Sequence, residues 1–225
     1  MVGADAVNAA ATLDAAAARV HDLLQLRGAH GVHWDAAAPE WAIAALAAAP
    51  WVVVRRAAPR DGCLAVGVRG ARRWQRAAAW LAPRHAAALL TPAALRGRVR
   101  GLAPARRRLP VFRALHRLET AWDCGGPADW GPGGSAGFEL ASGTASAGPL
   151  SDLDIVVRCA REPALQHARA WWQALPESPQ TRIDVLLEWP AGAASLAEYV
   201  AGGSYLLRAA DGASMRRHAC GEETA

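Results

Sequence analysis

The sequence predicts an α+β protein, because two kinds of hydrophobic pattern occur together in it. Alternating runs rich in β-branched residues, typical of strands, lie at 51–56, 64–69, 150–157 and 182–187. Apolar residues three or four positions apart, typical of helices, recur in other segments. The charge is also divided unevenly: residues 1–118 hold 18 Arg and 6 acids, whereas residues 119–225 hold 7 Arg and 14 acids. The N-terminal half is therefore basic and the C-terminal half acidic.

A chain of 225 residues is long enough to bury a substantial core. We predict a small basic N-terminal α/β domain at 13–95 and a mixed sheet with helices at 109–225. The segment 96–108, rich in Gly, Pro and Arg, is the expected linker between them. Residues 1–12 are rich in alanine and are expected to form a flexible leader.

In the first domain, helical spacing of apolar residues predicts a helix over 13–26. Pro39 before its start and Pro50 at its end predict another helix over 40–49. The strand-like runs 51–56 and 64–69 flank Pro59-Arg-Asp-Gly62, whose turn-forming residues predict a hairpin.

The segment 71–81 is predicted to form an amphipathic helix with Trp74 and Leu81 on its apolar side. A second stripe at helical spacing is entirely basic and consists of Arg69, Arg72, Arg73 and Arg76. Like charges at this spacing repel one another, and a solvent-exposed helix face would usually carry both positive and negative side chains. We therefore expect this arginine stripe to bind phosphate, with a solvated face as the alternative.

In the second half, Thr91-Pro92 is expected to open a short helix, and a longer helix is expected over 109–122. Gly and Pro make 130–134 a poor strand. The later elements are expected in the order turn at Gly134-Ser135, short helix to Gly143, strand 150–157, helix 162–175, strand 182–187, helix 193–200, and a strand-turn with Asp211-Gly212 at its tip.

Three acids are the candidate catalytic and metal-binding residues. Asp152 and Asp154 lie in one predicted strand, where residues i and i+2 point to the same face about 7 Å apart. Asp184 lies in another alternating run and could join them from a neighbouring strand. Carboxylate oxygens suit Mg²⁺, with Mn²⁺ as an alternative, and such ions serve phosphoryl and nucleotidyl transfer.

An ordinary explanation also exists for the acid pair: Asp152 would be a turn residue and Asp154 a charge at a strand edge. The small-residue turn Gly134-Ser135 upstream and Asp184 downstream favour the metal site.

Composition limits the possible partners. All 25 basic residues are Arg, and the net charge is +5. Such a field attracts nucleic acid, a polyphosphate nucleotide or an acidic carrier protein. The four cysteines form no Cys-x-x-Cys pair, as expected for reduced thiols in the cytoplasm. The longest apolar run, 41–54, is too short to span a bilayer, and the N-terminus has no signal-peptide pattern, so we expect a soluble protein without membrane contact.

The order of a Gly-Ser turn, an Asp-x-Asp strand and a third acid on a later strand is similar to the polymerase β-type nucleotidyltransferase superfamily. The likeness to one family is more specific and covers roughly residues 18–210. The sequence resembles the malonate decarboxylase holo-acyl carrier protein synthases, also called phosphoribosyl-dephospho-CoA transferases, in five segments that occur in order: 66–81, 91–98, 133–143, 149–158 and 183–199.

This resemblance implies a two-domain enzyme. It would attach 2′-(5″-triphosphoribosyl)-3′-dephospho-CoA to a serine of the malonate decarboxylase acyl carrier protein and release pyrophosphate. Asp152 and Asp154 would bind Mg²⁺, and Asp184 would complete the metal site or help deprotonate the incoming hydroxyl. The backbone N–H groups of Gly134 and Ser135 would contact a phosphate oxygen, unless the pair is an ordinary tight turn.

Nucleic acid is then not the expected partner. Two alternatives remain: a nucleotidyltransferase that acts on another small-molecule or protein hydroxyl, and a basic nucleic-acid-binding module.

Overall fold

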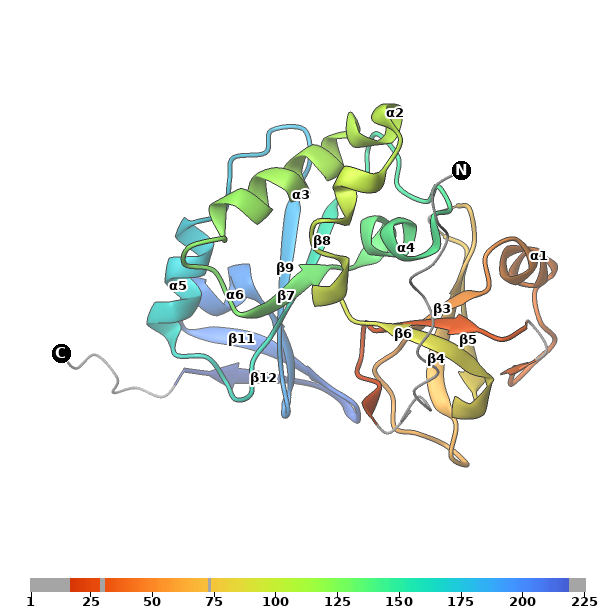
Figure 1. The fold of residues 1–225 in the computed structure, drawn as a ribbon. Helices are drawn as coiled ribbons and strands as arrows, with labels where there is room; N and C mark the ends of the chain where they lie inside the picture. The colour runs from red at the N-terminus through yellow and green to blue at the C-terminus, as the bar shows by residue number, and fades with distance from the viewer. Residues whose placement is uncertain (1–16, 29–30, 73, 219–225) are drawn as a thin grey trace. The chain divides into compact units, whose positions relative to one another are not determined.

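The molecule contains two six-stranded sheets together with several helices (Figure 1). The computed structural model describes residues 17–28, 31–72 and 74–218. The α+β class predicted from the sequence is confirmed. Within these residues no helix has both the length and the apolar character needed to cross a membrane. The expected leader, 1–12, lies outside the described residues.

The chain divides into two compact units. The first holds the described residues up to Arg55 together with Pro59–Leu89, and the second holds Arg56–Ala58 and the described residues from Leu90 onward. Residues 96–108, expected to form a linker, belong to the second unit, where they include two short helices.

The first unit is built on a sheet with strand order β2-β5-β4-β3-β1-β6. Its elements are β1 (Leu23–Leu26), β2 (Val32–His33), α1 (Glu40–Ala48), β3 (Trp51–Val54), β4 (Leu64–Arg69), β5 (Arg76–Leu81), η3 (Pro83–His85) and β6 (Ala86–Leu90). The predicted helix over 40–49 and the predicted hairpin are confirmed, since β3 and β4 pair antiparallel with Val53 opposite Gly67. Leu24, Val52 and Val66 are fully buried in its core.

Two helices predicted in this unit are wrong. The described part of 13–26 contains strand β1, which pairs with β3. The segment 71–81 contains a turn and then strand β5, which pairs with β4 along its whole length. Two of the four residues on the expected apolar side are alanines, Ala77 and Ala78. Because alanine fits either face of either element, cross-strand pairing decides the outcome.

The second unit is built on a sheet with strand order β12-β11-β10-β9-β8-β7, in which only the pair β8–β9 is parallel. Its elements are η4 (Ala93–Leu95), η5 (Arg98–Gly101), α2 (Pro104–Arg107), α3 (Pro110–Ala121), β7 (Asp129–Pro132), α4 (Gly134–Ser142), β8 (Leu153–Arg158), α5 (Leu165–Gln173), β9 (Ile183–Trp189), β10 (Gly192–Ser195), α6 (Leu196–Ala201), β11 (Ser204–Ala209) and β12 (Gly212–Arg217).

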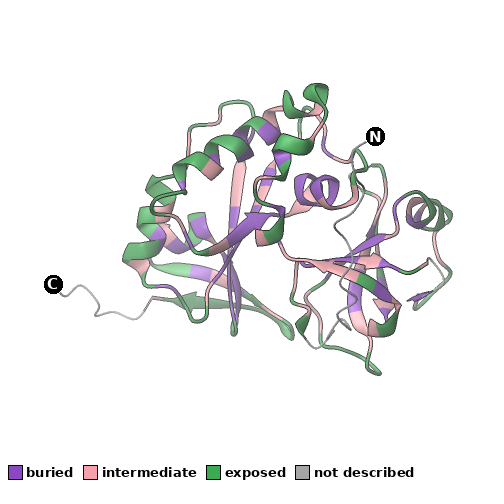
Figure 2. Ribbon diagram, in the orientation of Figure 1, coloured by how far each residue is buried: buried purple, intermediate pink, exposed green. Residues whose placement is uncertain are grey.

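Helices cover this sheet with their apolar sides. Helix α3, predicted over 109–122, buries Phe112, Leu115 and Leu118 completely and contacts β8. Helix α4 packs on β7 and β8, and α6 packs on β9, β10 and β11. Figure 2 shows the buried stripe along α3 and the contrasting exposure of β12, every residue of which is exposed.

The predictions for the second half hold for most elements. The short helix expected after Thr91-Pro92 is present as η4, although Pro92 rather than Thr91 takes the N-cap position; Thr91 Oγ1 accepts a hydrogen bond from the Ala94 N–H at 3.2 Å. The prediction of a poor strand at 130–134 is wrong, because β7 pairs with β8. The predicted helix over 193–200 begins later than expected, since β10 occupies its first residues.

Strand β7 tolerates its Gly and Pro for identifiable reasons. It is an edge strand and Pro132 is its last residue, a position where the missing N–H costs little. A Cβ atom at Gly131 would lie 1.9 Å from the Pro92 carbonyl oxygen. Only glycine therefore permits the close approach of η4 to this strand.

Candidate active site

The parallel pairing of β8 and β9 brings two of the three predicted acids together. In the register of the two strands, Asp154 stands directly opposite Asp184. Adjacent strands lie about 4.8 Å apart, so the two side chains are neighbours. Asp152 comes just before β8, two residues from Asp154 and therefore on the same side of the chain. All three acids are partly exposed, whereas Leu153 and Ile155 between and after them are buried.

The turn at Gly134-Ser135 lies against this acid pair. The Gly133 N–H donates a hydrogen bond to the Asp154 carbonyl oxygen at 2.8 Å, and α4 begins at the next residue. Gly134 has φ of +54°, and a Cβ atom there would lie 1.7 Å from Asp154 Oδ2. The first turn of α4, with the positive end of its dipole, is therefore held beside a carboxylate.

Arg182 spans two of the acids. Its Nη2 atom lies 2.6 Å from Asp184 Oδ2 and 3.4 Å from Asp152 Oδ2. The Arg182 carbonyl accepts a hydrogen bond from the Leu153 N–H at 2.8 Å, which fixes its backbone at the start of β9. The sequence analysis did not single out this residue, although its place two positions before Asp184 puts it on the same strand face.

The acids have the donor atoms that Mg²⁺ prefers. As the side chains stand, no three His, Cys, Asp or Glu residues in the described part of the chain converge to hold a metal ion. Magnesium, however, is usually held by one or two carboxylates together with waters and substrate phosphates. Asp154 and Asp184, on adjacent strand positions and partly open to solvent, fit a site of that kind.

An ion pair between a buried acid and a half-buried arginine supports the loop that leads into Asp152. Glu139 of α4 is 2% exposed and accepts two hydrogen bonds from Arg106, both at 2.7 Å. Its Oε2 atom also accepts the backbone N–H groups of Ser146 and Ala147, both at 2.9 Å. Arg106 in turn donates to the Ala147 carbonyl oxygen at 2.6 Å. The pair thereby fixes the chain between α4 and the acid strand.

These contacts determine the ionisation of Glu139. Burial alone would raise the pKa of this carboxyl group, but the hydrogen bonds from Arg106, Ala147 and Ser146 outweigh it and lower the pKa. The hydrogen bonds that Arg106 donates to Glu139 raise the pKa of Arg106. Sequence reasoning missed both residues because it placed Arg106 in a linker. The available sequence signal was a single acid, Glu139, within a predicted helix that has no other charged residue.

The predicted arginine stripe does not exist as a helix face. Arg69 ends β4 and Arg76 begins β5, and the two stand opposite each other across the strand pair. Arg72 lies in the turn between the strands, where its N–H donates to Gln75 Oε1, and Arg73 lies outside the described residues. Arg69, Arg72 and Arg76 thus gather at a hairpin end of the first unit, and the role of the stripe in binding phosphate stays a prediction.

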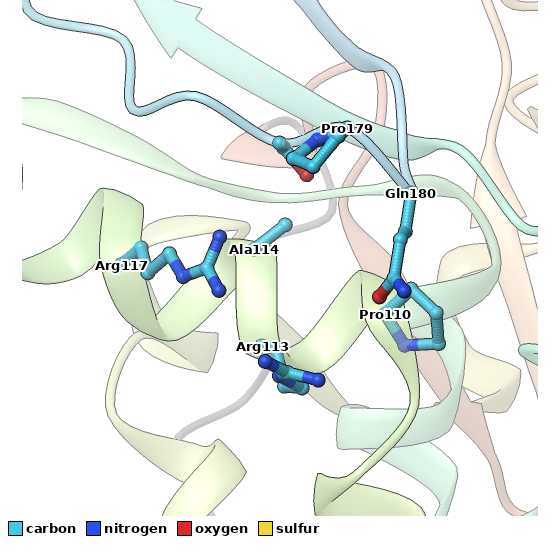
Figure 3. A pocket seen from close by; sticks show the side chains of 7 residues that line it. Pro110, Arg113, Ala114, Arg117, Pro179 and Gln180 are labelled. Atoms are coloured by element: carbon cyan, nitrogen blue, oxygen red, sulfur yellow. The ribbon is translucent and has the colours of Figure 1, made fainter.

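A small pocket of about 190 Å³ lies in the second unit between α3 and the loop before β9. Figure 3 shows Arg117 and Ala114 of α3 on one side, with Pro179 and Gln180 of the loop across from them. Arg117 donates a hydrogen bond from Nη1 to the Glu177 carbonyl oxygen at 3.2 Å. The pocket lining includes Arg113 and Arg117 and no acid, so the pocket is electropositive.

Comparison with known proteins places this chain in a family. Residues 19–92 match the N-terminal domain of phosphoribosyl-dephospho-CoA transferase MdcG, and residues 94–219 match its C-terminal domain. The two matches meet close to the structural division at Leu89 and Leu90. No solved structure shows significant similarity to the chain.

Curated relatives agree with the family match, and each carries the name phosphoribosyl-dephospho-CoA transferase. A protein of Pseudomonas fluorescens (strain Pf0-1) is 42% identical over 188 residues, which cover 83% of this chain and 86% of the relative. One of Azotobacter vinelandii is 40% identical over 203 residues, covering 87% and 91%. One of Klebsiella pneumoniae is 35% identical over 198 residues, covering 88% and 93%. The chain, a transferase with Asp154 and Asp184 paired on adjacent strands of its second unit, belongs to the phosphoribosyl-dephospho-CoA transferase family.

Proposed function

We propose that this transferase attaches the phosphoribosyl-dephospho-CoA group of 2′-(5″-triphosphoribosyl)-3′-dephospho-CoA to a serine of the malonate decarboxylase acyl carrier protein. Pyrophosphate would leave, and Mg²⁺ or Mn²⁺ would be required. The observation that carries this proposal is the register of the parallel strands, which sets Asp154 opposite Asp184 beside the Gly134 turn.

The reaction requires one bond to form and one to break at the α-phosphorus of the donor. The serine oxygen attacks that phosphorus, the bond to the bridging oxygen of the β-phosphate breaks, and pyrophosphate departs with the bonding electrons. The serine proton passes to a nearby base. A divalent ion, when bound, would neutralise the charge that develops on the phosphate oxygens.

The acids and the turn take separate roles in this scheme. Asp152 and Asp154 would hold the metal ion, and Asp184 would either complete its ligands or accept the serine proton. Asp184 suits both roles, because its side chain is 42% exposed and open to an incoming substrate. The backbone N–H groups of Gly134 and Ser135, at the start of α4, would bind a phosphate oxygen.

The distribution of charge supports an anionic donor and an acidic carrier. Residues 1–118 carry 18 Arg against 6 acids, and such a field raises the encounter rate with anions. Cys63, Cys124 and Cys159 are unpaired thiols, which supports a reducing compartment such as the cytoplasm.

The test is the intact mass of purified carrier protein after incubation with the enzyme, the donor and Mg²⁺. The proposal expects a mass increase equal to the phosphoribosyl-dephospho-CoA group, with one pyrophosphate released per modified carrier. A carrier whose reactive serine is replaced by alanine is the control. Release of pyrophosphate with an unmodified carrier would assign a different hydroxyl acceptor, and tight binding of nucleic acid without any transfer would favour a binding module.

A further inference from the structure

Arg182 occupies oxygen atoms that the proposed metal site would need. One guanidinium nitrogen contacts Asp184 Oδ2 at 2.6 Å and approaches Asp152 Oδ2 to 3.4 Å. Asp154 stands opposite Asp184 in the register of the parallel strands, and Asp152 precedes Asp154 by two residues. A positive charge placed between two of them offsets their mutual repulsion. Arg182 therefore acts as a built-in counter-ion of this acid group.

This counter-ion is placed where it can be displaced. The Arg182 side chain is 69% exposed, although its backbone is fixed by the hydrogen bond from Leu153. An exposed ion pair contributes little to stability, because solvent screens it and the long side chain loses freedom. The guanidinium group can thus leave the acids while the strand that carries it stays in place.

Once displaced, Arg182 remains within reach of whatever the metal binds. Its guanidinium group is planar and always charged, and its paired N–H donors match the geometry of phosphate oxygens. Arg182 comes just before β9 and two residues before Asp184, so its side chain lies on the same side of the chain as that acid. Phosphate oxygens bound to a metal at Asp154 and Asp184 would lie next to it.

We propose that Arg182 is a displaceable counter-ion that competes with the divalent ion for the acids and then binds the phosphates of the donor. This inference rests on the proposed function, since it requires the acids to bind metal. It makes two predictions of opposite sign for one substitution: without Arg182 the metal should bind more tightly, and a phosphate ligand should bind more weakly. A purely structural ion pair would not produce both changes together, because its loss would leave phosphate binding unaffected.

The experiment measures Mn²⁺ binding to the whole chain by electron paramagnetic resonance, first alone and then with pyrophosphate. For Arg182→Gln we expect the Kd for Mn²⁺ to fall about two- to fivefold, as the loss of one exposed competing charge implies. The Kd for pyrophosphate in the presence of saturating Mn²⁺ should rise about tenfold or more, as for a lost charged hydrogen bond.

Arg208→Gln is the matched control, because Arg208 makes a similarly exposed ion pair with Glu198, 3.9 Å away, that involves none of the three acids. It should change neither constant. Circular dichroism and thermal unfolding of both variants establish that they are folded. If Arg182→Gln misfolds, Arg182→Lys replaces it and should keep the charge while weakening pyrophosphate binding.

The outcomes separate this inference from the function on which it rests. Metal affinity that is unchanged or weaker in Arg182→Gln, while the unsubstituted chain binds Mn²⁺ and Asp154→Asn does not, would overturn the counter-ion role and leave the proposed function intact. An unsubstituted chain that binds no Mn²⁺, with or without pyrophosphate, would instead remove the metal site and the proposed function with it.

Discussion

Replacing Gly134 with alanine tests the link between the turn and the acid pair. The added Cβ atom would lie 1.7 Å from Asp154 Oδ2 and 2.6 Å from its Cγ. A Cβ contact closer than 3.0 Å is essentially never seen, so the carboxylate oxygen must move by at least 3.0 − 1.7 = 1.3 Å. A displacement of about 1 Å in a reacting centre can cost about a hundredfold in rate. We expect Gly134→Ala to lower kcat by about that factor or more.

The substitution also strains the backbone, and this effect has a matched control at the other end of the same helix. Gly134 has φ of +54° and Gly143 has φ of +72°, but a Cβ atom at Gly143 would meet nothing within 4 Å. Each alanine should cost about 1–2 kcal/mol of stability for its left-handed conformation. Only Gly134→Ala should also lose activity.

The assay combines urea unfolding with carrier modification measured over time by intact mass. Comparable loss of stability in the two variants, with activity lost only in Gly134→Ala, would confirm that the turn positions Asp154. Near-normal kcat in Gly134→Ala would refute the reasoning, because the carboxylate would then tolerate a displacement of more than 1 Å.

Three further predictions concern the acids, the metal and the ion pair of Glu139. Asp152→Ala and Asp154→Ala should each lower the transfer rate about a thousandfold, or about 4 kcal/mol, with an unchanged circular dichroism spectrum; turnover near that of the unsubstituted chain would make these acids structural. Activity should vanish with EDTA and return with Mg²⁺ or Mn²⁺, whereas full activity after exhaustive chelation would exclude the metal site. Because the pKa of Glu139 is lowered in the folded state, its charge stabilises the fold above about pH 4.5, and this contribution is lost as the pH falls through the lowered value. Glu139→Gln should therefore unfold about 2 kcal/mol more easily in urea at pH 7 and lose less stability than the unsubstituted chain on acidification; parallel acid profiles would contradict this.

The two strands that carry Asp154 and Asp184 could be predicted from the sequence, because their hydrophobic pattern is typical of strands and not of helices. The runs around Asp154 and Asp184 alternate and are rich in β-branched residues, so the strands and the shared acid face followed directly. The segment 71–81 failed because its alanines carry almost no preference for one face, and only pairing with β4 makes it a strand. Strand β7 was missed because the reason for its Gly131 is a tertiary contact: the backbone there packs closely against the carbonyl group of Pro92, which is distant in the sequence.

The parts of the site that escaped sequence reasoning depend on contacts between distant residues. Arg106 and Glu139 stand far apart in the chain, and only the folded unit joins them in an ion pair whose acid is buried. Arg182 is one of many arginines in the sequence, and only its contacts with the carboxylates of Asp152 and Asp184 mark it as a candidate site residue. Tertiary contacts of this kind leave no periodic trace in the sequence.

The most direct test of the central claim is a crystal structure of the chain with Mn²⁺ and pyrophosphate, in which anomalous scattering locates the metal. We predict a peak within about 2.5 Å of carboxylate oxygens of both Asp154 and Asp184. Pyrophosphate should complete the coordination, and the Arg182 guanidinium group should have moved from Asp184 to a phosphate oxygen. A metal peak at other residues, with Arg182 still bound to Asp184, would contradict the account.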